Sequence, residues 1–311
     1  NHHGCLAVIR NLHAAMQARG WRCTGSLPVS SSVNSLIRYR AELESADLIL
    51  VNGEGSLHHD SHNAMRLFSI CERLVDSHPV ALVNSIWQEN DAELWQPLVN
   101  RFHSIFVRDR LSLEELSKIV GRVGYAPDLT FYDYPRLKKQ SGYKYLYTDS
   151  VLNSLTETLL SLADNDPEVD FVTMFTDRLI HTRGMKDWPK RVKYRVNPLL
   201  WDAFHINVSP RYKTLKFALP NRDDLLNSFV SSRGVCVARY HALCFAIQQQ
   251  IPFVAIRSNS HKSEALLEEL GLPLDRFLIA SNDIMQIKER LEDIAGAFTT
   301  FEHQINSFNI K

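Results

Sequence analysis

The chain has 311 residues, enough for two hydrophobic cores of ordinary domain size or for one large core. Its hydrophobic fraction of 45% and charged fraction of 23% are typical of a soluble globular protein. Basic and acidic residues number 35 each, the net charge is zero, and no long basic block is present, which argues against nucleic acid as a partner.

No apolar run approaches the roughly 20 residues that a membrane span needs, so no transmembrane segment is expected and any membrane association should be peripheral. The cysteines are odd in number and scattered, without a CxxC pair, which predicts reduced thiols in a cytoplasmic protein. They are Cys5, Cys23, Cys71, Cys236 and Cys244. The chain begins at Asn1 without a methionine, which leaves a removed signal or missing leading residues open.

The first part of the chain alternates apolar runs with amphipathic segments. Residues 1–19 carry a helical stripe closed by Gly20, and the run 48–51 is apolar on both faces, as in a central parallel strand. Further strands are predicted over 80–83 and 104–107, and further helices over 63–75, 92–101 and 112–120. An irregular connection begins at residues 126–128.

The alternation pauses around residues 133–142, where Pro, Lys, Gln and Gly predict a linker. It then resumes, with strands predicted over 143–147, 169–175, 235–238, 252–256 and 277–279. Helices are predicted over 151–162, 221–229, 242–250 and 264–270, followed by a long terminal helix from residue 283. No repeat of fixed period is visible.

Two successive alternating halves predict an α/β protein with two doubly wound domains that face each other across a cleft. The first domain is assigned to residues 1–137 and the second to residues 138–285. Residues 286–311 are expected to form a terminal helix that packs back on the N-terminal domain.

The turn from Gly53 to Ser56 follows a buried strand, so its glycines can adopt positive φ and let a ligand approach the backbone. An ordinary strand-to-helix turn is about equally compatible with the spacing, which is not GxGxxG. The nearby His58, His59, Asp60 and His62 could bind a metal, but nothing fixes a tetrahedral set, and we assign no metal site.

Arg108 and Arg239 each stand at the end of an apolar strand, one in each half, where open α/β sheets bind ligands. As a pair they favour bidentate recognition of an anionic ligand, although a structural salt bridge would explain either one alone. His241 begins a helix, where it is either a helix cap or a general acid or base, and Tyr240 is expected to pack. Two further positions, Asp128 after Pro127 and Lys262 on an expected exposed loop, are candidates beside the ordinary roles of turn cap and solvated surface.

The order of these motifs resembles the polysaccharide pyruvyl transferase family. The family's N-x-x-G is similar to Asn1–Gly4, its strand and Gly-rich turn to residues 46–60, and its V-R-D-x-x-S to Val107–Ser112. Its P-D pair matches Pro127-Asp128, its R-x-H matches Arg239–His241, and its late lysine is similar to Lys262. The chain departs from the family pattern at Cys5, where an acidic residue is usual, and at Glu54, which interrupts the run of glycines; the strand expected before the first motif is missing.

The resemblance implies two Rossmann-like domains arranged as in GT-B glycosyltransferases, with phosphoenolpyruvate as donor, a saccharide or lipid-linked saccharide as acceptor, and no cofactor. A pyruvyl group would form a ketal on a sugar of a cell-surface polysaccharide, with release of phosphate. In this reading the donor contacts Arg108, Arg239, Lys262, Gly53 and Gly55, and His241 protonates it. Glu54 or Asp128 accepts the proton of the attacking hydroxyl, and the acceptor lies near Asn1, His3, Gly4, His58 and His59.

Two alternatives stay open at the level of the sequence. A GT-B-like glycosyltransferase would hold the diphosphate of a nucleotide sugar with the same arginine and histidine positions. A carbohydrate-binding or scaffold protein would keep the fold and lose the chemistry, and its expected sign is erosion of these positions, which are intact in this chain.

Overall fold

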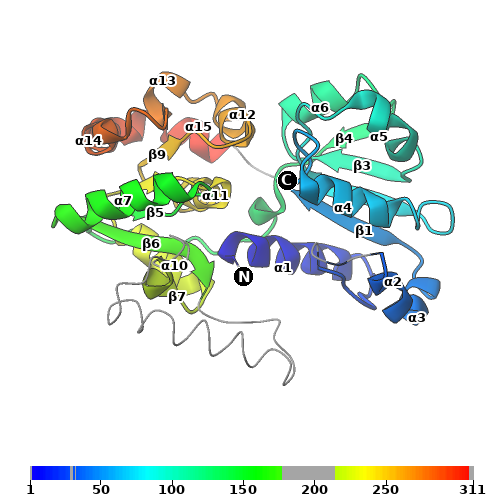
Figure 1. The fold of residues 1–311 in the computed structure, drawn as a ribbon. Coiled ribbons are helices and arrows are strands. Elements are labelled where there is room, and N and C mark those ends of the chain that lie inside the picture. The colour runs from blue at the N-terminus through cyan, green and yellow to red at the C-terminus, as the bar shows by residue number, and fades with distance from the viewer. Residues whose placement is uncertain (1, 29–30, 32, 177–213, 308–311) are drawn as a thin grey trace, which may run out of the picture.

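The computed structural model of the chain describes residues 2–28, 31, 33–176 and 214–307. In its first half, four strands form a sheet in the order β1-β2-β3-β4, and every neighbouring pair is parallel. The apolar runs predicted to be central strands, 48–51, 80–83 and 104–107, supply three of the four strands of this sheet (Figure 1). The strands are β1 (Ile49–Glu54), β2 (Val80–Ser85), β3 (Ser104–Val107) and β4 (Val123–Tyr125).

The core of this half includes large aromatic residues, with Phe68 and Trp95 contributed by helices and Trp87 by the loop after β2. Asp91 and Asp109 cap two of these helices with their side-chain oxygens, which satisfies backbone N–H groups that have no partner within a helix. The helices are α2 (Ser35–Arg38), α3 (Arg40–Glu44), α4 (His62–Cys71), α5 (Ala92–Val99) and α6 (Arg110–Leu116), followed by the 3-10 helix η1 (Leu129–Phe131).

The second half contains a six-stranded parallel sheet, within the described ranges, of order β10-β9-β8-β5-β6-β7. From β5 the chain first builds outward through β6 and β7, and then returns to the other side of β5 with β8. This is the doubly wound order, and the point where the direction reverses lies between β5 and β8. The strands are β5 (Tyr145–Thr148), β6 (Val169–Thr176), β7 (Ala218–Leu219), β8 (Gly234–Val237), β9 (Phe253–Ile256) and β10 (Leu278–Ile279).

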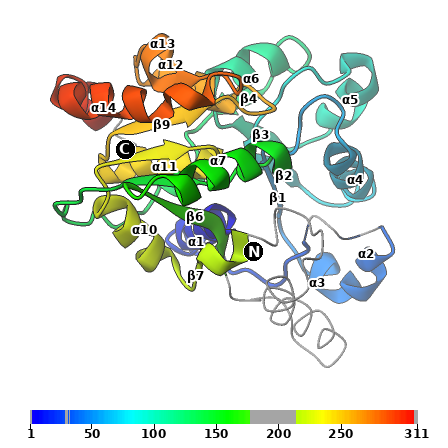
Figure 2. The same cartoon turned by 60° about the vertical axis from the view of Figure 1, so that its left-hand side comes forward.

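Helix α11 (Tyr240–Gln249) lies at the centre of this half, and all of its residues are buried. Figure 2 shows it among the strands and helices of the second sheet. The other helices are α7 (Asn153–Asn165), α10 (Arg222–Val230), α12 (Lys262–Glu269), α13 (Leu274–Phe277), α14 (Ile287–Ala297) and α15 (Glu302–Ser307), with 3-10 turns η3 (Thr214–Phe217), η4 (Ile284–Gln286) and η5 (Phe298–Thr300).

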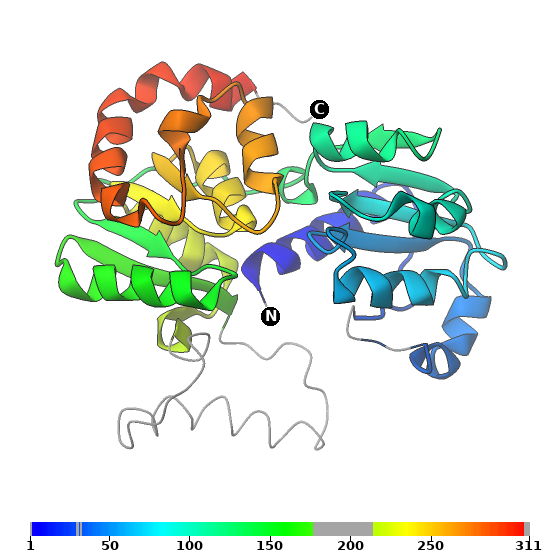
Figure 3. The ribbon, with the colours of Figure 1, turned by 45° about the horizontal axis from the view of Figure 1, so that its top comes forward.

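Both ends of the described chain pack on the second sheet. Helix α1 (His3–Gln17) places Ala7 in the core of the second half and runs between the two halves (Figure 3). At the other end, Leu291, Ile294, Phe298 and Ile305 belong to the same core. Residues 286–307 therefore pack on the C-terminal half instead of the expected N-terminal half, because their apolar stripe faces the neighbourhood of β8 and β9.

Three local expectations differ from the structure. The long terminal helix is broken into η4, α14, η5 and α15, and the short strand β4 was not expected, since three residues give too little pattern to recognise. At the turn after β1, the positive φ belongs to Glu54, at 42°, and not to either glycine. No helix in the described ranges is long and apolar enough to cross a membrane.

Candidate active site

Three basic side chains gather where the loops after β1, β3 and β8 meet the start of α12. Arg108 directly follows β3, Arg239 follows β8 after one residue, and Lys262 is the first residue of α12. Gly55 marks how close two of them are, since a Cβ built on it would lie 3.6 Å from Arg108 Nη2 and 3.8 Å from Lys262 Nζ. We call Arg108, Arg239 and Lys262 the cationic cluster.

Lys262 was expected on an exposed loop, but it is buried, with 8% of its surface exposed. Within the described part of the chain its ammonium makes no ion pair, and its hydrogen bond runs to Asn259 Oδ1 at 3.4 Å. Burial lowers the pKa of Lys262 to about 8, and the neighbouring Arg108 and Arg239 add to this shift. A buried, poorly compensated ammonium of this kind favours an anionic ligand.

Arg108 is almost fully buried, and its Nη1 donates to Asp128 Oδ2 at 2.7 Å. Its guanidinium lies over the ring of Tyr240, 4.2 Å from the centroid, so Tyr240 supports a charge as well as packing. Among the described residues, Nε of Arg108 has no hydrogen-bond partner. Part of the guanidinium is therefore available to a ligand.

Asp128 holds two of the candidate residues together. Its Oδ1 accepts from the Thr130 backbone N–H at 2.8 Å, and its Oδ2 lies 3.9 Å from His241 Nε2. Burial by itself would raise the pKa of this carboxyl, but Arg108, His241 and the Thr130 backbone together hold the pKa below its usual value. Asp128 is therefore ionised at neutral pH and is a weak base.

Arg239 lies at the reversal point of the second sheet, between the ends of β5 and β8. Its Nε donates to Asp149 Oδ2 and its Nη2 donates to the Ser150 carbonyl, both at 2.7 Å. The guanidinium also lies over the ring of Phe175, 4.8 Å from the centroid. Asp149 is buried and was not singled out from the sequence, although its position directly after the apolar run 145–148 was a usable signal.

His241 is buried at the start of α11, and its Nε2 has no hydrogen-bond partner among the described residues. Gly4 lies flat against the ring, since a Cβ built on Gly4 would come within 2.2 Å of His241 Cγ. Burial lowers the pKa of His241, Asp128 and Glu54 oppose that shift, and Arg108 and Lys262 add to it. The imidazole is therefore neutral at neutral pH until the surrounding charge changes.

Glu54 ends β1 and faces α1. Its Oε2 accepts from Cys5 Sγ at 3.1 Å, and its Oε1 accepts from Asn52 Nδ2 at 2.8 Å. The adjacent Gly53 is required by close packing, because a Cβ there would lie 2.4 Å from Ser85 Oγ. This turn therefore presents a half-buried carboxylate beside α1 and the loop after β1.

The histidines after β1 do not converge on one point. His59 pairs with Glu89 at 3.2 Å, Asp60 accepts from Trp95 Nε1 at 2.5 Å, and His62 contacts Arg66 at 2.9 Å. Burial lowers the pKa of His58, and Lys262 of the cationic cluster adds to this shift. Of the other residues expected near the acceptor, His3 is buried in α1, and Asn1 lies outside the described residues.

Hydrogen bonds hold the two halves together around the cluster. The backbone N–H of His261 donates to Gln88 Oε1 at 2.9 Å, and its Nε2 lies 3.2 Å from Asp109 Oδ1. Glu269 of α12 accepts from the Tyr125 hydroxyl and from the backbone N–H of Arg110. The start of α12, and with it Lys262, is thereby fixed against the first half.

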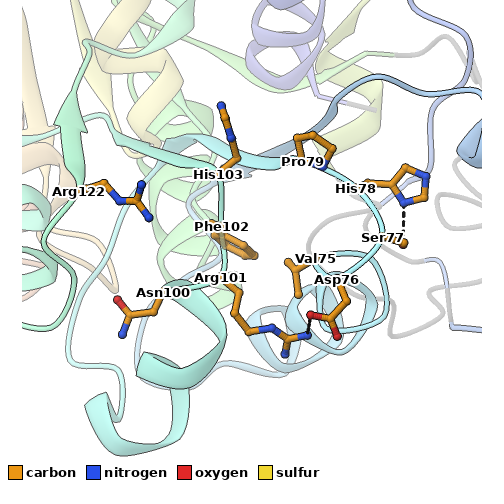
Figure 4. Close-up of a pocket in the computed structure, with 10 residues that line it drawn as sticks. All are labelled: Val75, Asp76, Ser77, His78, Pro79, Asn100, Arg101, Phe102, His103 and Arg122. Atoms are coloured by element: carbon orange, nitrogen blue, oxygen red, sulfur yellow. Dashed lines mark hydrogen bonds and ion pairs between the residues drawn. The ribbon is translucent and has the colours of Figure 1, made fainter.

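One group of described residues could hold a metal ion, and the sequence had suggested none there. It consists of His2, Cys5 and His241, each offering one ligand atom, and these atoms all lie within 4.8 Å of one another. A separate open pocket of about 460 Å³, lined by residues such as His78, Arg101 and Arg122, lies at the opposite end of the first sheet (Figure 4). It contains none of the candidate residues.

One comparison with known proteins shows the family of the chain, and another shows its fold. The family model described as polysaccharide pyruvyl transferase matches residues 17–260 of the chain. The structure of S. aureus MnaA with UDP is similar with a TM-score of 0.53 at 12% identity, over 96% of this chain and 87% of that one. An uncharacterized protein of Klebsiella pneumoniae subsp. pneumoniae NTUH-K2044 is similar with a TM-score of 0.50 at 11% identity, over 86% and 84% of the two chains.

No curated protein matches the chain by sequence. At these identities the structural likenesses concern the fold alone, and they show the GT-B-like arrangement of two α/β halves that was expected.

Proposed function

The chain belongs to the polysaccharide pyruvyl transferase family and is therefore a transferase, and on that premise we propose that it moves the pyruvyl group of phosphoenolpyruvate onto a sugar. The sugar belongs to a cell-surface glycan or its precursor, the product is a pyruvate ketal, and phosphate is released. The proposal includes no cofactor and no nucleic-acid partner.

The observation that carries the proposal is the cationic cluster. Phosphoenolpyruvate has two anionic groups, a carboxylate and a phosphate. Three basic side chains lie together here, and two of them are ion-paired, Arg108 with Asp128 and Arg239 with Asp149. Arg108 and Lys262, which both lie within 4 Å of the place a Gly55 Cβ would take, are suited to one anionic group, and Arg239 at the reversal point of the sheet is suited to the other. The backbone at Gly53 and Gly55 would complete the donor site.

The reaction needs a proton on the methylene carbon of the donor. We assign the delivery of this proton to His241. Addition of the proton to the double bond leaves an oxocarbenium-like carbon, which the oxygen of a sugar hydroxyl attacks. A second hydroxyl then displaces phosphate at the same carbon, so two C–O bonds form and the C–O bond to phosphate breaks. The base first accepts the hydroxyl protons. After exchange with solvent, one proton is on the released phosphate and the other has restored the protonated form of His241.

Donor binding would itself prepare His241 for this role. Arg108 and Lys262 both lower the pKa of the imidazole in the free protein. An anion bound to them compensates their charge, so the pKa of His241 rises when the donor is present. The acid would then be protonated mainly in the complex where it is needed.

Glu54 is the better of the two candidate bases. Asp128 is fully buried, paired with Arg108, and has a pKa held below its usual value, so its affinity for a proton is low. Glu54 is half-buried at the end of β1, where an acceptor could reach it. In this proposal Asp128 orients Arg108 and His241, and Glu54 accepts the hydroxyl proton.

The acceptor would lie on the side of α1 and the loop after β1. His3 and Gly4 of α1, with His58 and His59 after β1, are the candidate contacts, together with Asn1. A cytoplasmic location, with the saccharide free or carried on a lipid at a membrane surface, is part of the proposal.

The test is to incubate the protein with phosphoenolpyruvate and a panel of saccharides, and to measure phosphate and product mass together. Phosphate release matched by a product heavier by one pyruvyl ketal supports the proposal. Release of phosphate without that product would mean hydrolysis, and no release with any acceptor would contradict the proposal.

A glycosyltransferase that uses a nucleotide sugar is the alternative, because the same basic residues could hold a diphosphate. The same assay run with nucleotide sugars separates the two activities. Binding or turnover of a nucleotide sugar, with none for phosphoenolpyruvate, would favour the alternative. Full biological activity of folded Arg239→Ala and His241→Ala variants would instead favour a non-catalytic role.

A further inference from the structure

Two residues of α1 lie next to the proposed proton donor. His2 is the N-cap of α1, and Cys5 is three residues further on, so both side chains lie on one face of the helix start. The His2 ring lies 5.6 Å from the His241 ring, centroid to centroid. The ligand atoms of His2, Cys5 and His241 all lie within 4.8 Å of one another.

The site has a fourth ligand available. Glu54 Oε2 is 3.1 Å from Cys5 Sγ, so a carboxylate oxygen stands beside the thiol. Two imidazoles, a thiolate and a carboxylate are a ligand set that Zn²⁺ accepts, with Zn–N near 2.0 Å and Zn–S near 2.3 Å. Such bonds place tetrahedral ligands about 3.3–3.8 Å apart, so movements of about 1 Å would bring the ligand atoms of His2, Cys5 and His241 to these separations, and Glu54 would join them from beside Cys5.

An independent observation points to a ligand at this place. His241 Nε2 is buried and has no hydrogen-bond partner among the described residues, and the nearest charged oxygen, Asp128 Oδ2, is 3.9 Å away. Buried polar nitrogens normally have a partner, and an isolated one calls for an explanation. His2 uses its Nδ1 to accept from the Gly4 backbone, which leaves its Nε2 for another ligand.

From this geometry we propose that His2, Cys5, His241 and Glu54 bind a thiophilic divalent metal ion, with Zn²⁺ the best fit. On binding, the Cys5 S–H bond breaks, the proton goes to solvent, and the thiolate and the metal form a bond. The consequence, which rests on the proposed function, is inhibition of the transfer. The metal would occupy the nitrogen of His241 that delivers the proton and the carboxylate of Glu54 that accepts one. Zinc would thus switch the transferase off.

Co²⁺ is the probe for binding, since a tetrahedral cobalt–thiolate site gives visible d–d bands and a thiolate-to-cobalt charge-transfer band. The protein, prepared without a polyhistidine tag, is titrated with Co²⁺ and then with Zn²⁺. We expect the charge-transfer band to reach its maximum at one equivalent of Co²⁺ and to disappear when Zn²⁺ is added. The Cys5→Ser variant should lack the band. The His2→Gln variant should weaken cobalt binding at least tenfold.

Matched controls are Cys23→Ser, which removes an exposed thiol, and His13→Gln, which changes a histidine further along α1. Both should keep the band, and circular dichroism of each variant checks its fold. Absence of the band in the parent protein, its persistence in Cys5→Ser, or its loss in Cys23→Ser would overturn the proposal.

A second arm measures transfer with and without Zn²⁺. In the parent protein the transfer rate with Zn²⁺ should be at least tenfold lower than the rate without it. In Cys5→Ser the two rates should be nearly equal. Because the cobalt spectra need no turnover, they decide the metal site even if the pyruvyl transfer assay fails. A metal band without inhibition would keep the site and reject its regulatory effect.

Discussion

The guanidinium of Arg108, from the first half of the chain, lies 4.2 Å from the centroid of the Tyr240 ring, from the second half. The same guanidinium pairs with Asp128, so one cation is fixed by a carboxylate and by an aromatic face at once. An arginine of the proposed donor site is thereby held rigid before any ligand arrives, which reduces the entropy that binding must overcome.

Replacing Tyr240 with Leu should weaken donor binding. A cation–π contact contributes about 0.5–2 kcal/mol, so the Kd for phosphoenolpyruvate should rise roughly 2- to 30-fold, measured by calorimetry. Tyr240→Phe keeps the ring and should bind nearly as the parent does. The control Phe253→Leu removes a buried aromatic ring of the second core and should lower stability without changing this Kd. Equal Kd values for the parent and Tyr240→Leu would show that the ring only packs.

Gly4→Ala should displace the His241 ring, because the new Cβ would lie 2.2 Å from His241 Cγ. We expect kcat to fall on the order of 10²-fold, the usual range for loss of a general acid. Gly121→Ala is the matched control, since a Cβ there meets nothing within 4 Å, and it should leave kcat unchanged. A Gly4→Ala variant with parental kcat would remove His241 from the mechanism.

Arg239→Lys should lose most transfer activity, because lysine cannot reproduce the two hydrogen bonds to Asp149 and Ser150. The expected loss in kcat/KM for the donor is on the order of 10²-fold or more, by analogy with oxyanion-site deletions. Asp149→Asn should cost about tenfold, since it removes only the charge of the partner. Lys144→Ala breaks a surface ion pair of the same sheet and should change kcat/KM little.

Donor affinity should decrease as the pH rises through about 8, the pKa of Lys262. Below that pH the ammonium is charged and attracts the donor, whose phosphate is already ionised because its last pKa is near 6. The check is the Kd for phosphoenolpyruvate between pH 7 and pH 9.5. Lys262→Arg should remove the decrease, because arginine stays charged over the whole range. A flat profile in the parent protein would place Lys262 outside the donor site.

Lys262→Met should stabilise the protein at neutral pH. The folded state depresses the pKa of this lysine from 10.5 to about 8, so below pH 8 the folded protein carries an unfavourable charge that the unfolded chain tolerates. The variant should gain up to about 3 kcal/mol in the free energy of unfolding at pH 7. The gain should shrink between pH 8 and 10.5 as the lysine deprotonates. Urea unfolding at several pH values measures it, with Lys118→Met as an exposed control.

The sequence predicts the two α/β halves well because parallel strands are apolar on both faces and stand out as runs. It also places Arg108 and Arg239 at strand ends and His241 at a helix start, where the structure has them. It could not show the burial of Lys262, which depends on Gln88 and Asp109 of the other half holding the start of α12. Nor could it show that Cys5 and Glu54 meet, because that contact spans 49 residues.

The pair of Asp149 and Arg239 joins residues that are 90 positions apart, across the point where the second sheet reverses. During synthesis Asp149 emerges first, and until β8 docks beside β5 its carboxylate has no arginine. Closing a sheet over an unpaired carboxylate costs several kcal/mol, so a chain cut short before residue 239 should remain open and susceptible to proteases. The same contact therefore also couples closure of the second sheet to the arrival of β8 beside β5.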